Sequence, residues 1–130
     1  MYVNSKSLTV NVSAEKLFNF VSTPENLPKW AVNYCHSIQK DGDIYRIQGP
    51  MGESYFDIKA DAQSGVIDMY GGSSKDMLHP FPSRVVSLPD GSAHLTMTCV
   101  MMEDLSEEDI KKLEQSFAEE FDMLRQQVMS

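Results

Sequence analysis

This sequence has few cysteines, no long hydrophobic run and no secretion signal. Its 130 residues include two cysteines, Cys35 and Cys99. One thiol pair cannot form a disulfide framework, so we expect both thiols to be reduced and buried in a cytoplasmic protein. Segment 1–10 has neither a basic nor an apolar stretch, which predicts no secretory signal. No run approaches the length and hydrophobicity of a membrane span, so we expect no membrane insertion.

Basic side chains are also scarce. The chain has 11 Lys and Arg residues against 19 Asp and Glu residues, a formal net charge of −8. Nucleic-acid binding needs a positive surface, so this balance argues against a nucleic-acid partner. It also disfavours docking on anionic lipid. We interpret the acidic excess as a solvated surface that keeps the protein in solution.

Signatures of metal and cofactor binding are missing as well. Cys35 and His36 are adjacent, and no second pair of ligating residues lies at metal-site spacing. The two glycines at 71 and 72 precede Ser73 and Ser74 rather than the Gly-Lys-Ser/Thr ending of a phosphate-binding loop. No serine lies in a nucleophile elbow. We therefore expect neither a metal nor a cofactor.

The clearest pattern that is present lies at the end of the chain, where segment 106–130 is predicted to be one long amphipathic helix. Ser106 and the acids after it form a capping-box pattern at its start. We assign the acidic pair Glu119 and Glu120 to the exposed face of this helix, where solvation explains them. The apolar residues recur at steps of three and four and share the other face: Ile110, Leu113, Phe117, Phe121, Leu124 and Val128.

The rest of the chain is predicted to begin with a strand over residues 8–12, a helix over 13–22 and a short helix that starts at Pro24. About six strands follow between residues 33 and 102. They are expected at residues 34–39, 44–48, 55–60, 66–70, 84–88 and 93–102.

Two segments of this region are expected to be irregular. Residues 71–75 are interpreted as a flexible connection because of their glycines and serines. Residues 77–81 are extended, but Pro80 and Pro82 fit only an edge strand or an irregular strand. Consecutive strands joined by short turns are antiparallel. The predicted element order is β-α-α-β(6)-α.

Three segments carry a resemblance to a known family: VNVSAEKLFNFVSTPENLPKW at 10–30, SRVVSLPDGSAHLTMT at 83–98, and the helix at 105–128. With the element order, they resemble the polyketide cyclase/dehydrase and START-like (SRPBCC) superfamily, whose helix-grip fold is that of the birch-pollen allergen. The resemblance covers nearly the whole chain and implies one α+β domain over residues 1–130. It implies a curled antiparallel sheet of six to seven strands around the long C-terminal helix, with a mostly apolar cavity between them.

The resemblance leaves three functions open. The first is binding of a small hydrophobic, aromatic or lipid-like molecule in the cavity, by a monomer or a weak homodimer. The second is a cyclase or dehydratase acting on a polyketide-like substrate. The third is a protein-interaction module similar to the hydrolase activators. An enzyme needs at least two polar groups that converge in the cavity, whereas a binding protein needs only a large pocket with few polar anchors.

The candidate site residues follow from strand parity and from the implied cavity. Tyr34 and His36 are placed on one face of a strand, where they could share acid–base chemistry, with Arg84 as a partner for a carboxylate or an enolate oxygen. His79 is expected at the rim of the cavity, and Met77 and Met101 are expected to line it. The residues predicted to bind the ligand are Trp30, Tyr34, His36, Phe56, Met69, Met97, Cys99, Phe117 and Phe121.

Overall fold

The structure, a computed structural model, describes residues 1–130 and contains one antiparallel sheet in which seven strands follow the order β1-β7-β6-β5-β4-β3-β2. The elements are β1 (Tyr2–Val10), α1 (Ala14–Val21), the 3₁₀ helix η1 (Pro24–Asn26), α2 (Leu27–Trp30), β2 (Ser37–Asp41), β3 (Ile44–Gly49), β4 (Gly52–Asp61), β5 (Val66–Ser74), β6 (Met77–Ser87), β7 (Ala93–Met101) and α3 (Glu107–Met129). This architecture confirms the predicted α+β helix-grip fold and its element order.

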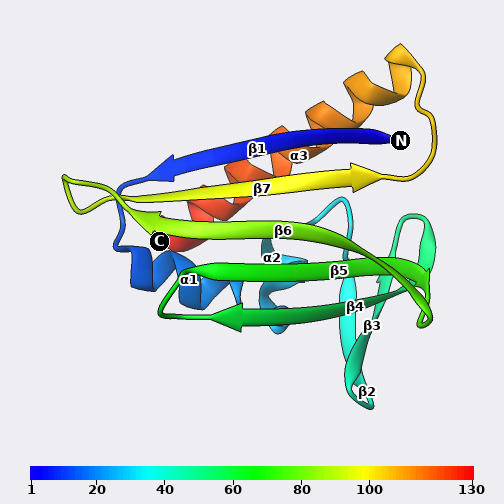
Figure 1. Ribbon diagram of the computed structural model, residues 1–130, viewed down its shortest axis with the longest axis horizontal. Helices are drawn as coiled ribbons and strands as arrows, with labels where there is room; N and C mark the ends of the chain where they lie inside the picture. Colours follow the sequence, from blue (N-terminus) through cyan, green and yellow to red (C-terminus); the bar gives the residue numbers. More distant parts are fainter.

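The sheet curls around the helices. In Figure 1 the β2–β3 hairpin bends sharply out of the plane of the other strands, and α3 crosses behind β1 and β7. Helix α2 packs against both α3 and β2, and α1 packs against β6 and β7. The concave face of the curled sheet is therefore wrapped around the helices.

Helices α1 and α3 begin where the sequence supplies capping groups. The Ser13 hydroxyl accepts a hydrogen bond from the Lys16 N–H at 3.1 Å, and the Ser106 hydroxyl accepts one from the Asp109 N–H at 3.1 Å. These contacts satisfy donors that the first turn of a helix leaves unpaired. None of the helices is both long and apolar enough to cross a membrane.

The core lies between the concave face of the sheet and the second half of α3. The parity predicted for the last strand is confirmed, because Leu95, Met97 and Cys99 are buried while Thr96 is exposed. Leu124 and Val128 of α3 are almost fully buried against this face. Successive strand residues point to opposite sides of the sheet, so this alternation separates core from surface.

Several strands begin elsewhere than the sequence predicts, β1 and β2 among them. Strand β1 starts at Tyr2 rather than at residue 8, because its polar first half pairs with β7 along the sheet edge. Strand β2 starts at Ser37, and Tyr34 lies in the turn before it. The interpretation that Tyr34 and His36 share a strand face was therefore wrong, since the alternation of a strand does not apply in a turn.

The glycine-rich segment after residue 70 is part of a strand, so the expected flexible connection was also wrong. Strand β5 continues through Gly71 and Gly72 to Ser74. A Cβ at Gly71 would lie 2.8 Å from the Tyr34 hydroxyl oxygen. A Cβ on Gly72 would collide with the main-chain carbonyl of Met77 across the hairpin. Both glycines thus allow close approach rather than flexibility.

The two prolines lie where β6 has a neighbour on one side only. Strand β6 pairs with β5 along most of its length, but it pairs with β7 only over residues 83–87. Pro80 and Pro82 fall in the half without β7 contact, as expected for residues that cannot donate to a ladder. In Figure 1 β6 bends away from β7 at this end. The sheet is therefore split beside the first residues of β6.

Candidate functional site: a cavity between the sheet and α3

A cavity of about 530 Å³ lies between the concave sheet and the helices α2 and α3. Of its 28 lining residues 15 are hydrophobic, so its wall is mostly apolar. They come from α2, the turn after it, the β3–β4 turn, β4 to β7 and the first two-thirds of α3. The lining includes Leu27, Trp30, Tyr34, Ser54, Phe56, Met69, Gly71, His79, Phe81, Met97, Met101, Leu113, Ser116, Phe117, Glu120 and Phe121.

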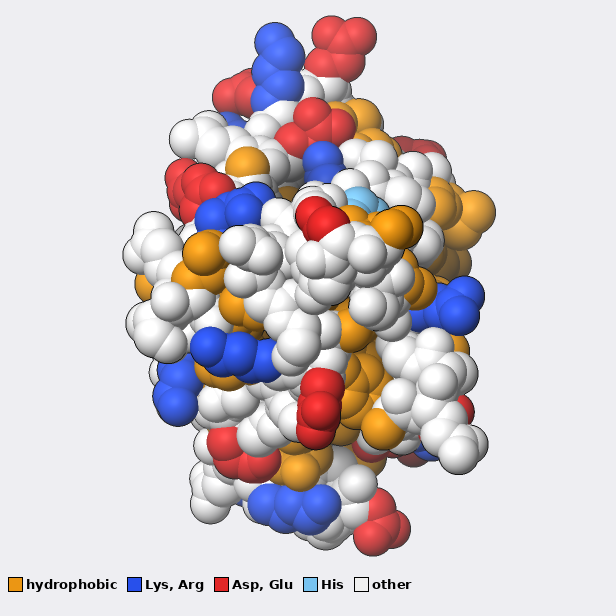
Figure 2. All heavy atoms as spheres, turned by 90° about the vertical axis from the view of Figure 1, so that its left-hand side faces the viewer, with side chains coloured by type: hydrophobic (Ala, Val, Ile, Leu, Met, Phe, Trp, Pro, Cys, Tyr) orange, Lys and Arg blue, Asp and Glu red, His pale blue; other side chains and the backbone are white.

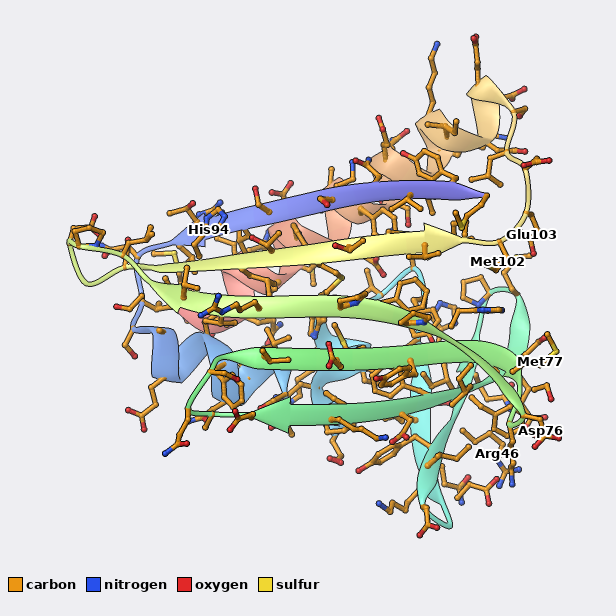
Figure 3. All side chains as sticks on the ribbon, viewed as in Figure 1. Arg46, Asp76, Met77, His94, Met102 and Glu103 are labelled. Carbon is orange, nitrogen blue, oxygen red and sulfur yellow. The ribbon has the colours of Figure 1, made fainter.

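The cavity extends to the end of the molecule where β7 finishes. Met102 and Glu103, which line the cavity, lie at this end together with Met77 and the β5–β6 turn, whereas His94 lies at the opposite end (Figure 3). Met51 of the β3–β4 turn is 99% exposed and also belongs to the lining. The cavity therefore reaches the end of the sheet at which β6 and β7 no longer pair with each other, although β6 still pairs with β5 and β7 with β1.

Two donors in the cavity wall have no partner. The indole Nε1 of Trp30 and the hydroxyl of Tyr34 are buried, and neither forms a hydrogen bond of normal geometry, although the Ser54 side chain is close enough to the Tyr34 hydroxyl to affect its pKa. Trp30 is 4% exposed, and its ring centroid lies 6.4 Å from that of Phe121. Leaving a buried polar group unpaired costs about 1–3 kcal/mol. The cavity therefore contains two groups that gain free energy when a ligand or a water pairs with them.

Tyr34 is held by its neighbours so that its ring enters the cavity. Its main-chain carbonyl lies directly over Gly49, and its hydroxyl lies over Gly71. Burial raises the pKa of Tyr34 to about 12, although the nearby Ser54 side chain lowers it. The phenol is therefore protonated at all physiological pH values and acts as a hydrogen-bond donor.

Glu120 is the functional residue that the sequence analysis missed. Its assignment to the exposed face of the last helix was wrong, because the side chain is 5% exposed and lines the cavity. The Asn33 N–H donates to its Oε2 at 3.1 Å. Burial raises the pKa of the Glu120 carboxyl to about 7, although the N–H groups of Asn33 and Tyr34 lower it. The carboxyl thus changes charge near neutral pH.

The position of Glu120 in the helical period could have predicted its burial. It lies three residues after Phe117 and four before Leu124, at the same period as the apolar residues. Counting only apolar residues assigned this position to the wrong face. Its neighbour Glu119 is exposed, as predicted. One acid of the pair is therefore solvated and the other is in the cavity wall.

The structure brings most of the predicted ligand-site residues together in this cavity. Its lining contains Trp30, Tyr34, Phe56, Met69, Met97, Phe117 and Phe121. His79 and Met101 line it too, whereas Met77 is 64% exposed and does not.

Three candidates lie outside the lining. His36 is exposed and does not line the cavity. Cys99 is buried but does not line the cavity. Arg84 is exposed, and its Nε donates to the carbonyl of Ser64 at 3.1 Å. The structure therefore does not bring His36, Tyr34 and Arg84 to one point.

A smaller depression of about 260 Å³ lies on the β2–β3 hairpin. Only Ile38 among its five lining residues is hydrophobic, and the others include Arg46 and Gln48. All of them come from one hairpin. It lacks the buried apolar wall of a small-molecule site, so the larger cavity is the candidate site.

The face of the molecule at the end opposite the β5–β6 turn is not uniformly acidic, although the chain has a net negative charge. Figure 2 views the end that carries α1 and the β6–β7 turn, and it shows acidic and basic side chains interspersed, with hydrophobic atoms between them. The electrostatics of the cavity therefore depend on the charged side chains that line it, and not on the net charge of the chain.

Comparison with known structures shows which fold this is. A START superfamily protein from Mycobacterium smegmatis is 19% identical, covers 99% of this chain and 98% of its own, and gives a TM-score of 0.70. The Zhui aromatase/cyclase from Streptomyces sp. R1128 is 9% identical over 98% of this chain and 93% of its own, with a TM-score of 0.74. Aha1 from Colwellia psychrerythraea, solved as a dimer, is 14% identical over 96% and 94%, with a TM-score of 0.72.

These neighbours confirm the resemblance to START-like and polyketide cyclase-like proteins at the level of the fold. No family model matches the chain. No curated protein sequence matches it significantly either. The likeness thus shows a helix-grip fold, and the chemistry of the site depends on the residues that line the cavity of this chain.

Proposed function

We propose that this protein binds a small hydrophobic or aromatic molecule in the cavity between the sheet and α3. The observation that carries the proposal is the combination of a mostly apolar wall with the two unpaired donors of Trp30 and Tyr34. The volume of about 530 Å³ falls in the range of small-molecule sites, which is roughly 300–1,000 Å³. All the walls come from one chain, so a monomer suffices for binding.

The wall predicts what kind of molecule binds. Burial of an apolar ligand against Phe56, Met69 and Phe117 gains roughly 25 cal/mol for each Å² of apolar surface removed from water. A ligand that also offers one acceptor satisfies the Trp30 indole or the Tyr34 hydroxyl. An apolar body with one polar end therefore fits better than a pure hydrocarbon.

The only tryptophan of the chain provides the test, because Trp30 lies in the cavity wall. The neutral dye Prodan, an aromatic ketone, is titrated into the protein. We expect saturable quenching of Trp30 emission and a blue shift of the dye. Ser116→Phe fills the cavity from α3 and should abolish both signals, whereas Gln126→Phe on the exposed face of α3 should leave them unchanged. Dye binding that is unaffected by Ser116→Phe refutes the proposed site.

One observation favours a second candidate function, an acid–base enzyme. The Glu120 carboxyl and the Tyr34 phenol line the same cavity, with pKa values of about 7 and about 12. An ionised Glu120 can remove a proton from the carbon beside a ketone, while the Tyr34 hydroxyl donates a hydrogen bond to the enolate oxygen. This is the elementary step of aldol cyclisation.

The enzymatic candidate is tested by exchange of the α protons of 2-tetralone in D₂O, followed by NMR. The wild-type rate should rise as pH increases through about 7, where Glu120 ionises. Glu120→Gln should reduce the exchange to the rate of buffer alone. If the wild-type protein exchanges these protons only at the rate of buffer alone, the enzymatic candidate is refuted and ligand binding stays the proposed function.

A further inference from the structure

The charged side chains that line the cavity are all acidic. Glu120 forms part of the inner wall, Glu53 lies at the start of β4 and pairs with Arg46 at 3.4 Å, and Glu103 follows the end of β7, whereas no lysine or arginine lines the cavity. The lining also contains one imidazole, that of His79, and one phenol, that of Tyr34. The cavity thus lacks the cation that normally holds a carboxylate or phosphate ligand.

The buried carboxyl of Glu120 has no ionic partner in the protein. Lys6, on β1 beside Cys99, is the cation that approaches this region, and it forms its ion pair with Glu114 at 4.0 Å. The other salt bridges of the chain do not include Glu120. Its main-chain contacts are with the Asn33 N–H, which donates to Oε2 at 3.1 Å, and with the Tyr34 N–H, and both are uncharged donors. A buried carboxyl with so little compensation is stabilised by any cation that enters the cavity.

Aromatic rings surround the same space. Trp30 and Phe121 pack with ring centroids 6.4 Å apart, and Tyr34, Phe56 and Phe117 line the cavity with them. The face of an aromatic ring attracts a cation, and the attraction is stronger where water is excluded. The ring faces and the carboxyl therefore both favour a positively charged ligand.

We propose that the natural ligand is a hydrophobic amine, bound as its ammonium ion with the charge beside Glu120 and the apolar body against the aromatic wall. This proposal rests on the proposed binding function and names the chemical class of its ligand. The free hydroxyl oxygen of Tyr34 supplies an acceptor for the ammonium group. Fatty acids and other anions are disfavoured, because a second negative charge would be buried next to Glu120 with no cation to offset it.

Several groups face Glu120 and bear on the pH dependence. Glu119 precedes it on α3, Tyr34 and the Asn33 amide face it from the turn after α2, and Cys99 with its neighbour Lys6 faces it from the sheet. An aliphatic amine stays protonated through neutral pH. Amine affinity should therefore increase as pH rises from about 6 to about 8, because Glu120 ionises in that range.

The test compares three ligands that share one naphthalene body: 2-(2-naphthyl)ethylamine, 2-(2-naphthyl)ethanol and 2-naphthylacetic acid. Each is titrated by calorimetry at about pH 6 and about pH 8. At the higher pH we expect the amine to bind about tenfold more tightly than the alcohol and the acid to bind most weakly. His36→Gln, at an exposed position outside the cavity lining, should leave the pH dependence in place.

Variants of α3 then assign the preference to Glu120. Glu120→Gln should reduce the ratio of amine to alcohol affinity to within about threefold and remove its pH dependence. Asp122→Asn, which removes one exposed charge two residues away, should keep the wild-type ratio.

Each outcome of the ligand series is decisive. An acid or an alcohol that binds the wild-type protein as tightly as the amine overturns the amine assignment and leaves cavity binding intact if Prodan binds. The same holds if Prodan binds and none of the three ligands does. Failure of Prodan and of all three ligands overturns the binding function itself. The wild-type comparison needs no variant, so it stands even if a substitution impairs folding.

Discussion

Replacing Glu120 with glutamine should stabilise the folded protein above neutral pH. The Glu120 side chain is 5% exposed, and burial raises the pKa of its carboxyl from 4.5 to about 7. One pKa unit corresponds to about 1.4 kcal/mol. Ionisation of this carboxyl therefore lowers the free energy of unfolding by about 3 kcal/mol above about pH 7. Glutamine has the same shape and an oxygen for the Asn33 N–H, but no charge.

The sign of the effect follows from the direction of the pKa shift. The folded protein holds the Glu120 proton more tightly than the unfolded chain, so the stability from this proton is fully present below the unfolded pKa of about 4.5 and is lost as pH rises through about 7. The wild-type and Glu120→Gln proteins should thus be similarly stable near pH 4.5. The variant should be more stable by about 2–3 kcal/mol near pH 8.

The assay is urea denaturation at intervals between about pH 4.5 and pH 9, followed by far-ultraviolet circular dichroism. Asp122→Asn is the control, because it removes an exposed charge from the same helix. Its stability difference from wild type should vary little over this range. A Glu120→Gln difference that is equally independent of pH would refute a buried, titrating carboxyl at this position.

Further predictions follow from the packing around the cavity. Gly71→Ala should lower the free energy of unfolding by about 1–3 kcal/mol, because the new Cβ is forced against the Tyr34 hydroxyl. Adding Tyr34→Phe to this variant should recover part of the loss in thermal denaturation, and strictly additive losses would contradict the contact. Leu124→Ala, at a fully buried position, should lower the free energy of unfolding by about 2–5 kcal/mol in urea denaturation. Phe117→Ala should lower it less, because Phe117 is half-buried in the cavity wall, and should weaken Prodan binding instead. Burial raises the pKa of both cysteine thiols to about 11, so iodoacetamide near pH 8 should label them slowly in the native protein and rapidly in urea; equal rates would show exposed thiols.

Local patterns predicted the elements well where one face is buried continuously. The capping serine at 106 and the period of Phe121 and Leu124 placed α3 and its buried face correctly. The alternation around Met97 placed the inward face of β7. These signals are local, because the period of an element and the side that meets the core are set by residues close in sequence.

The candidate site was predicted less completely. Phe56 and Met97 were placed in the cavity by strand parity, and Trp30 by the resemblance, because it follows the short helix near where the cavity of that family opens; all three line the cavity. Glu120 was missed, since its polarity suggested solvent although its position suggested the core. His36 was included only because a strand was extended over a turn.

The amino-acid pattern alone was sufficient for the order of strands and helices, the antiparallel pairing and the amphipathic α3, and the family resemblance added the curl of the sheet. Only the packed chain could show that Glu120 is buried without a cation, that Gly71 admits the Tyr34 ring, and that β6 separates from β7 beside Pro80. The physical reason is distance along the chain. The local pattern acts within a few residues, whereas the burial and pKa of Glu120 depend on groups from Asn33 to Cys99 that meet it only in the fold.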